Sequence, residues 1–407
     1  MDLTSHPLVV RARRLATDLL VPEAERIDQE GVPASHIEAV KRSGLLGVAA
    51  PAEYGGAGAP PAVLRETAEI LAGACGATWF VQTQHHTPVQ TLVRGERAVR
   101  ERLLGPLSRG ELLSGVAYAH LRSYPRRPVR VRREGTGWRF DGTVPWYTGW
   151  GLNDVMLLAG VTDSDEVLFA FAEAREQPGL RASAPMRLAA LTAARTVSLE
   201  LDGLWLPAEA VALHTPYDRW AAGDRVKTLA TSPAVFGVAE AALSLLDDEA
   251  AAPLRSRLSG LRDRAYALAD APVPQARAEE RSVAGAEGAG HGPTVRGAAA
   301  GENVDDWGGE GMDDSSGEGV DDSSGEGVDD WAAQRLAVRA EAYDVMRAAT
   351  TAAVVAGGGR AMALTSRAQR LAREGLFLLV QGQTAESRAA HLRALGGAPA
   401  TTGEQER

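Results

Sequence analysis

The stretch that decides the fold is residues 41–58, which read KRSGLLGVAAPAEYGGAG. It stands between two segments that carry helix signals. Before it, Ser35 is followed three residues later by Glu38, which predicts a capping box at the start of a helix. Gly44, inside the stretch, predicts the end of that helix. After it, Pro61 suits the first turn of another helix, which we expect over Pro61–Ala74.

Outward from this stretch the chain changes character twice. Up to about residue 112 the pattern is helical, and from 113 to 215 apolar and polar residues alternate, as Val129 and Val131 do with neighbouring arginines. After residue 216 helical spacing returns. The apolar positions there are Leu254, Leu258, Leu261, Ala265 and Leu268, then Ala368, Leu371, Ala372, Gly375, Leu376 and Leu379, with Arg367, Arg370, Arg373 and Glu374 expected on the opposite side.

These changes predict an α+β protein of three domains. We expect an N-terminal helical domain over residues 1–112 and a central β-barrel-like domain over 113–215. A C-terminal four-helix bundle should follow over 216–400. In that bundle, Thr384 is expected to cap a last helix that ends at Gly396.

An acidic repeat interrupts the C-terminal region. From Gly301 the chain contains four copies of an eight-residue unit, GENVDDWG, GEGMDDSS, GEGVDDSS and GEGVDDWA. They hold twelve acidic residues, without which the net charge of −10 becomes about +2. The repeat does not match calcium-binding loops, which need carboxylates at alternate positions. Because such a composition buries little apolar surface, we expect residues 275–331 to be a disordered insertion between two helices.

Length and composition exclude several classes of protein. The chain has 407 residues, 45% hydrophobic and 24% charged, which is an ordinary globular composition. It lacks the apolar run of ~20 residues that spans a membrane, and a nearly neutral folded part is not suited to nucleic acid. The single cysteine, Cys75, excludes a disulfide framework and a multi-cysteine zinc site, so we expect no metal. The start, MDLTSH, lacks the pattern of a secretory signal, and we expect a cytoplasmic enzyme.

Several local sequences, taken in order, resemble the acyl-CoA dehydrogenase superfamily of flavoproteins. Residues 41–58 are similar to a glycine-rich segment of that family's N-terminal part. The further similar segments are Gly137–Gly142 (GWRFDG), Trp146–Gly149 (WYTG), Leu206–Glu209 (LPAE), Gly237–Ala242 (GVAEAA), and Gly358-Gly359 followed by Arg370 and Arg373. They cover nearly all of the chain outside the insertion. The resemblance therefore implies the fold of the family.

The resemblance also implies that the protein binds FAD. The residues that match the family's cofactor contacts are Ala119, His120, Trp146, Thr148, Gly358, Gly359 and Thr384. A hydroxyl group such as that of Thr148, beside the flavin atom that accepts hydride, would stabilise charge as it develops. Without the resemblance each has a plainer interpretation. Trp146 would be a core aromatic, Thr148 a strand residue, the glycines a helix terminus and Thr384 only a helix cap.

The partners that the resemblance implies are of three kinds. One is a small-molecule substrate, for which an acyl-CoA thioester is the first candidate. Another is an electron-transfer protein or a flavin reductase. The third is a further copy of the chain, in a homo-oligomer (dimer or tetramer) in which the last helices, including Leu371–Leu379, form the interface. Neither nucleic acid nor a membrane is expected as a partner.

The catalytic base departs from the family pattern. In the family a glutamate removes the substrate α-proton, and its position here holds Gln381 or Gly382, depending on the alignment. Neither can accept a proton. Asp224 lies near a second location that part of the family uses, and its alternative interpretation is a solvent-exposed acid. His120 is a further candidate by residue type.

Two other groups of residues each allow a functional and a structural interpretation. His85 and His86 lie in the helix that would line the substrate pocket, where they either contact the substrate or only support the fold. The loop that covers the flavin in the family is replaced by a basic segment, which predicts either an anion site or a solvated strand face. Its arginines are Arg122, Arg126, Arg127, Arg130, Arg132 and Arg133.

Three functions remain after these comparisons of residues. The first is an FAD-dependent oxidoreductase that acts on the CH–CH group of an acyl thioester or related substrate, with a relocated base. The second is a flavin-dependent monooxygenase of the same fold, which needs no such glutamate. The third is a non-catalytic paralogue that assembles with an active partner.

Overall fold

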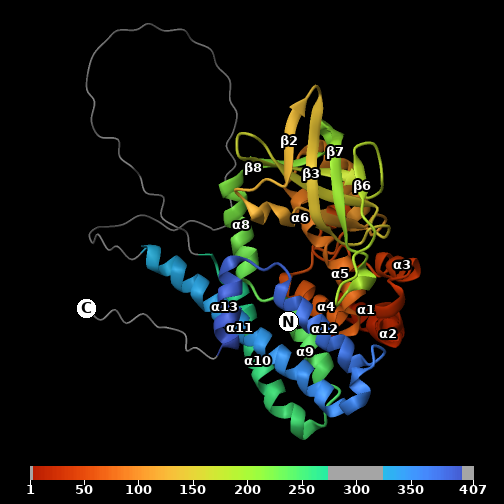
Figure 1. The fold of residues 1–407 in the computed structure, drawn as a ribbon, viewed down its shortest axis with the longest axis vertical. Coiled ribbons are helices and arrows are strands. Elements are labelled where there is room, and N and C mark those ends of the chain that lie inside the picture. Colours follow the sequence, from red (N-terminus) through yellow and green to blue (C-terminus); the bar gives the residue numbers. More distant parts are fainter. Residues whose placement is uncertain (1–2, 274–323, 397–407) are drawn as a thin grey trace. The chain divides into compact units, whose positions relative to one another are not determined.

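The computed structural model describes residues 3–273 and 324–396. Contacts divide the chain into one compact unit, residues 1–271 with 334–407, and a second, residues 272–333. Every strand of the described residues belongs to the first unit (Figure 1). So does every candidate site residue.

Helices make up the N-terminal part of the first unit. They are α1 (Pro7–Leu15), η1 (Ala16–Leu20), α2 (Val21–Glu30), α3 (Ala34–Arg42), η2 (Ala52–Tyr54), α4 (Pro61–Ala74), α5 (Gly76–Thr83), α6 (His86–Val93) and α7 (Arg97–Ser108). The prediction of a helix over Pro61–Ala74 is confirmed, with Pro61 in its first turn. The predicted capping box is wrong, because α3 begins one residue before Ser35 and follows the extended Pro33 without a side-chain cap.

The stretch 41–58 folds back on itself after α3. Gly44 takes the left-handed conformation with φ of 76°, which terminates the helix as expected. The backbone amides of Ala57 and Gly58 then donate to the carbonyl oxygens of Gly47 (2.9 Å) and Ala50 (2.8 Å). These bonds close a compact turn that leads the chain into α4.

A mixed sheet of eight strands forms the middle of the chain. The strands are β1 (Ser114–Ala117), β2 (Val129–Glu134), β3 (Gly137–Tyr147), β4 (Val155–Val161), β5 (Glu166–Glu173), β6 (Leu180–Ala182), β7 (Val197–Pro207) and β8 (Val211–Pro216). Their order is β6-β7-β3-β2-β4-β5-β8, with β1 beside β4 in parallel. Along this order the end strands β6 and β8 are not paired in the described residues, so the sheet is open and not a closed barrel.

The alternation of residue types places one face of the sheet in the core. Val129 and Val131 on β2 are buried and Arg130 and Arg132 are exposed. On β7 the predicted apolar positions are all buried; they are Val197, Leu199 and Leu201. Phe140 on β3 lies in the same core cluster. The alternation with a period of two therefore predicted correctly which residues of these strands are buried.

The C-terminal part returns to helices, as predicted. They are α8 (Tyr217–Leu229), α9 (Pro233–Leu243), α10 (Asp248–Asp270), α11 (Ser324–Gly357), η6 (Gly358–Met362), α12 (Arg367–Val380) and α13 (Ala385–Leu395). Ser324, where α11 begins, lies inside the predicted insertion of residues 275–331. Its expected disorder concerns residues 275–323, which lie outside the described residues. Thr384 caps α13 through Ser387, and the helix ends at Gly396.

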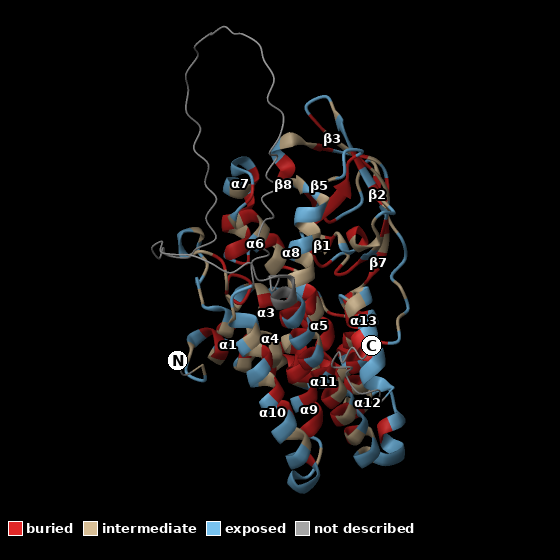
Figure 2. Ribbon diagram, turned by 90° about the vertical axis from the view of Figure 1, so that its left-hand side faces the viewer, coloured by how far each residue is buried: buried red, intermediate tan, exposed pale blue. Residues whose placement is uncertain are grey.

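Helix α9 is the central element of the helical core. It contacts α4, α10 and α12, and nearly all of it is buried (Figure 2). Its approach to α4 requires two glycines. A Cβ atom on Gly237 would lie 2.0 Å from the carbonyl oxygen of Glu69, and one on Gly73 would lie 2.6 Å from that of Gly237. The two helices therefore cross with their backbones in contact.

Candidate active site

A cleft of about 390 Å³ opens between three segments of the chain. They are η3 (Ala119–Ser123), helix α8, and the turn that leads from α12 into α13. The side chains that line the cleft are Arg122, Tyr217, Trp220, Ala221, Asp224, Arg225, Thr228, Gln383, Thr384, Ala385 and Arg388. Its volume lies in the range of small-molecule sites. Of the predicted site residues, Asp224 and Thr384 meet here.

Helix α8 provides one wall of the cleft through a single face. Tyr217, Trp220, Asp224 and Thr228 are spaced by three and four residues and so point the same way. Tyr217 is held firmly, because Tyr124 stacks on its ring with centroids 4.0 Å apart and its hydroxyl donates to the carbonyl of Leu121 (3.1 Å). The wall therefore presents aromatic rings beside one carboxylate.

Asp224 is not a solvent-exposed acid, so that interpretation of this residue is wrong. Arg122 donates to both of its oxygens, from Nε to Oδ2 (2.6 Å) and from Nη2 to Oδ1 (2.8 Å). Only 11% of the Asp224 side chain is exposed. A bidentate pair of this kind fixes both partners. Each oxygen keeps a second lone pair that Arg122 does not use.

Two more arginines line the cleft. Arg225 on α8 pairs with Glu386, with 2.9 Å between Nε and Oε1. Glu386 is thus held at the edge and is not among the lining side chains. Arg388 is oriented by Gln383, whose Oε1 accepts from its Nε (3.0 Å).

Gln381 and Gly382 do not line the cleft, although the next two residues do. Gln381 ends α12 in an extended conformation, and Gly382 turns the chain with φ of 61°. The turn brings Gln383 and Thr384 to the cleft. Asp224 is then the only carboxylate among the lining residues that the structure describes.

His85 and His86 are held by the fold. The backbone amide of Ser114 donates to Nδ1 of His85 (3.1 Å), so Nε2 carries the hydrogen and donates to the carbonyl of Leu107 (3.2 Å). Burial lowers the pKa of His85 to about 3. His86 accepts from the side-chain amide of Gln82 (2.8 Å), and burial lowers its pKa to about 4. Neither residue lines the cleft, and their contacts match the structural interpretation.

His120 is a buried neutral imidazole at η3. Its Nε2 donates to the carbonyl of Ala159 (3.0 Å), and within the described residues Nδ1 has no hydrogen-bond partner. Burial lowers its pKa to about 4. Ala119 beside it is exposed. His120 does not line the cleft, so its candidacy as a base there has no support from the geometry.

The arginines of the basic segment do not gather into one anion site. Arg122 binds Asp224, Arg127 binds Asp165 and Arg132 binds Asp141. Arg133 lies over the ring of Trp138, 5.3 Å from its centroid. Arg126 and Arg130 are exposed. Three of these six arginines are therefore paired with carboxylates, and only Arg122 reaches the cleft.

The end of β3 forms a second polar site, whose residues are not among those that line the cleft. Trp146 is 54% exposed and is not the core aromatic of the plainer interpretation. The hydroxyls of Thr148 and Thr196 lie 3.2 Å apart, and one bond between them leaves one hydroxyl hydrogen uncommitted. Asn153 donates to the Tyr147 hydroxyl (2.9 Å) and the Thr148 carbonyl (2.8 Å). Its Oδ1 is buried and has no partner in the described residues.

A strained segment lies against this strand end. Leu191 and Arg195 are non-glycine residues with φ of 57° and 51°, a conformation that costs of order 1–3 kcal/mol each. The segment is held by the amides of Gly149 and Trp150, which donate to the carbonyls of Ala194 (2.8 Å) and Arg195 (3.2 Å). Strain of this kind persists where surrounding structure enforces it, often at functional sites.

The residues at this strand end fit a flavin. They offer an exposed indole, a spare hydroxyl hydrogen and an unpaired amide oxygen. A flat heteroaromatic ring with its own donors and acceptors complements such a set. Gly358 and Gly359 lie elsewhere, in the exposed η6, where a Cβ atom on either would meet nothing of this chain within 4 Å. Their close approach to a cofactor would need a second subunit.

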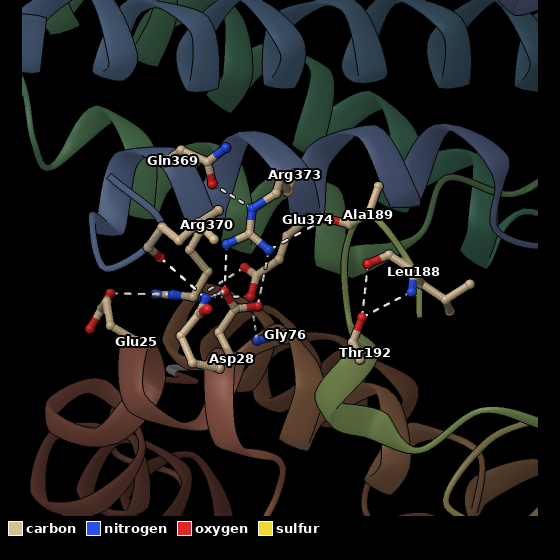
Figure 3. Close-up of polar contacts among 12 residues, drawn as sticks. Glu25, Asp28, Gly76, Leu188, Ala189, Thr192, Gln369, Arg370, Arg373 and Glu374 are labelled. Atoms are coloured by element: carbon tan, nitrogen blue, oxygen red, sulfur yellow. Dashed lines mark hydrogen bonds and ion pairs between the residues drawn. The ribbon is translucent and has the colours of Figure 1, made fainter. Parts of the chain in front are cut away.

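A buried charge network joins α12 to the N-terminal helices (Figure 3). Arg370 is 1% exposed and binds both oxygens of Glu374 (2.8 and 2.9 Å) and Oε1 of Glu25 (3.3 Å). Glu374 also accepts from the amide of Gly76 (3.2 Å). The expectation that Arg370 and Glu374 lie opposite the buried face of α12 is wrong, and Leu376, predicted on that face, is 60% exposed.

Arg373 extends this network to the strained segment. It binds Asp28 on α2 (3.2 Å from Nη1 to Oδ1) and donates to the carbonyl of Ala189 (3.4 Å). Figure 3 shows Ala189 beside Leu188 and Thr192, which bond to each other just before Arg195. Helix α12 therefore links the two candidate sites: Arg373 in its middle contacts the strained segment, and its C-terminal end leads into the turn at the cleft.

Residues 3–273 and 324–396 contain no group of three His, Cys, Asp or Glu side chains arranged to hold a metal ion. No helix in the same ranges has both the length and the apolar character to span a membrane.

Comparisons with known proteins agree with this architecture. Residues 6–111 match the family model for the N-terminal domain of acyl-CoA dehydrogenase. A short-chain specific acyl-CoA dehydrogenase of Clostridium acetobutylicum is 26% identical over 171 residues, which are 40% of this chain and 45% of that protein. The aligned part thus spans less than half of that relative.

Solved structures extend the likeness to the whole fold. A glutaryl-CoA dehydrogenase of Mycobacterium smegmatis, in complex with FADH2, gives a TM-score of 0.67 at 17% identity, covering 97% of this chain and 95% of that one. A dibenzothiophene monooxygenase of Paenibacillus gives 0.68 at 16% identity, covering 96% and 97%. Residues 6–111 thus match the N-terminal domain of the acyl-CoA dehydrogenase family, and the chain has the fold of these enzymes along nearly its whole length.

Proposed function

We propose that this protein is an FAD-dependent oxidoreductase of the acyl-CoA dehydrogenase type, acting on the CH–CH group of an acyl thioester. The observation that carries the proposal is the position of Asp224. It lies in a cleft of small-molecule size, with the turn containing Gln383 and Thr384 among the other lining residues. A proton acceptor in such a cleft is what removal of a substrate α-proton requires.

In this proposal Asp224 is the catalytic base and Arg122 positions it. A substrate entering the cleft takes over one hydrogen bond of the Arg122–Asp224 pair, and the released oxygen accepts the α-proton. Trp146 and Thr148 would hold the flavin, and Asn153 fixes the backbone of Thr148 by donating to its carbonyl. Bound FAD supplies the acceptor for the hydride that leaves the β-carbon. The remaining work of the chain is to orient the thioester and to exclude water.

One observation favours a second candidate function. Both oxygens of Asp224 are held by Arg122, and the cleft has no other carboxylate among its described lining residues. A flavin-dependent monooxygenase needs no such base, and a monooxygenase has the same fold. The third hypothesis, a non-catalytic subunit, corresponds to one outcome of the test below.

The assembly we propose is a homo-oligomer formed through the C-terminal helices. Their surface exposes large apolar side chains at Val355, Met362, Leu364, Leu376, Val380, Leu392 and Leu395. Exposed apolar residues concentrated on one region mark protein interfaces. The same surface includes η6, so a second copy would place its cofactor beside Gly358 and Gly359.

The test loads the purified protein with FAD, removes free flavin by gel filtration, and adds acyl thioesters without oxygen. We expect flavin to remain bound and its visible absorbance to bleach. Retained flavin that does not bleach, together with oxygen-dependent hydroxylation once the flavin is reduced, would instead indicate the monooxygenase. A protein that retains no flavin would support the non-catalytic reading.

A further inference from the structure

The walls of the cleft contain almost no aliphatic surface. Among its eleven described lining residues there is no Leu, Ile, Val, Met or Phe. The apolar contributions come from Ala221, Ala385 and the rings of Tyr217 and Trp220. Apolar walls favour binding of a saturated chain because they remove each of its methylene groups from water. A long saturated acyl chain would gain little of this in the cleft.

The charge of the same walls is positive. Three arginines and one aspartate line the cleft. Arg122 is compensated by Asp224, and Arg225 by Glu386. Arg388 bonds through Nε to the neutral Gln383, and within the described residues its Nη1 and Nη2 have no hydrogen-bond partner. The cleft therefore holds one guanidinium group that is oriented but not neutralised.

From these two observations we propose that the cleft selects a short acyl group that carries its own negative charge, and that Arg388 binds this charge. The proposal rests on the proposed function and names its substrate class. A planar guanidinium group with two free nitrogens suits a carboxylate or a similar oxyanion in bidentate geometry. A short acyl group also matches a cleft of about 390 Å³ that has no apolar extension for a longer chain.

The test measures binding of three thioesters to the FAD-loaded protein by calorimetry without oxygen. The probes are glutaryl-CoA (short, anionic), butyryl-CoA (short, neutral) and octanoyl-CoA (long, neutral). We expect glutaryl-CoA to bind at least tenfold more tightly than either neutral thioester. All three carry the same CoA phosphates, so an Arg388 contact with CoA cancels from the ratio of affinities.

Two variants assign the preference to Arg388. In R388Q the ratio of glutaryl-CoA to butyryl-CoA affinity is expected to fall at least tenfold. In the matched control R393Q, which removes an exposed arginine of the same helix outside the cleft, the ratio should not change. An unchanged ratio in R388Q, or octanoyl-CoA binding as tightly as glutaryl-CoA to the wild type, overturns this inference and leaves the proposed function standing. If no thioester binds, the proposed function fails with it.

Discussion

Replacement of Glu374 by glutamine is expected to destabilise the protein by about 3–5 kcal/mol, because it leaves the guanidinium group of Arg370 buried with a weaker partner. Arg370 is 1% exposed, and after the change only Glu25 (3.3 Å) would remain as its carboxylate. Burial alone would lower the pKa of Arg370, but the attraction of Glu374 outweighs it and raises that pKa. Glutamine has nearly the same shape as glutamate and can still accept the hydrogen bond from the Gly76 amide. The loss of stability therefore measures the contribution of the negative charge of Glu374.

The measurement is the free energy of unfolding in urea, with two comparisons. Glu341→Gln removes a partner from the exposed pair of Arg264 and Glu341 (3.4 Å) and should cost less than about 1 kcal/mol. The double variant Arg370→Met, Glu374→Leu replaces both charges with apolar groups and should recover part of the loss, because no buried charge is left alone. A loss below about 1 kcal/mol for Glu374→Gln would show that the network is not a main support of α12.

Acid is expected to destabilise the protein steeply between about pH 6.5 and pH 4. Burial lowers the pKa of His85 to about 3 and that of His120 to about 4, from the ordinary value of 6.5. In this window the unfolded chain binds protons that the folded chain does not. Stability is therefore complete above pH 6.5 and falls as the pH drops, by about 1.4 kcal/mol per pH unit for each residue. His86 and His391, each with a pKa of about 4, act in the same direction.

A variant separates this effect from the titration of carboxylates. His120→Gln can keep the hydrogen bond to the Ala159 carbonyl but cannot be protonated. The slope of unfolding free energy against pH between about 6.5 and 5 should fall by about 1.4 kcal/mol per pH unit. Equal slopes for wild type and His120→Gln would contradict the account of buried neutral histidines.

Much of the fold could be predicted because its signals are local. Pro61 and the apolar spacing after it were enough to locate α4, and alternation located β2 and β7. The predicted capping box is absent because the helix begins at Ala34, directly after the extended Pro33. Ser35 is therefore already inside the helix and cannot cap it. The beginning of α11 at Ser324 was missed because the acidic repeat has the same composition before and after that residue. Composition alone therefore does not show where the helix starts.

The candidate site was predicted less well because its contacts join distant parts of the sequence. Arg122 and Asp224 are 102 positions apart, so nothing near Asp224 announces its partner. Arg370 and Glu374 have the four-residue spacing of an ion pair on one helix, which is usually exposed. Here the pair is buried because other helices pack over it, and one of them brings Glu25, 345 positions away, to Arg370. Charged residues are usually exposed, and their burial here depends on the packing of helices that are distant in the sequence. The face of α8 with Tyr217, Trp220 and Asp224 was a usable signal that the sequence analysis did not combine.

The central claim is that Asp224, in the cleft, takes a proton from the substrate. Its most direct test is the rate of flavin reduction in a single turnover without oxygen, using Asp224→Asn and, as control, Asp218→Asn on the exposed first turn of the same helix. A general base contributes ~10²–10⁴-fold, so we predict that Asp224→Asn slows reduction by that factor while thioester binding remains and Asp218→Asn reacts at the wild-type rate. Reduction of the flavin at the wild-type rate by Asp224→Asn would contradict the claim.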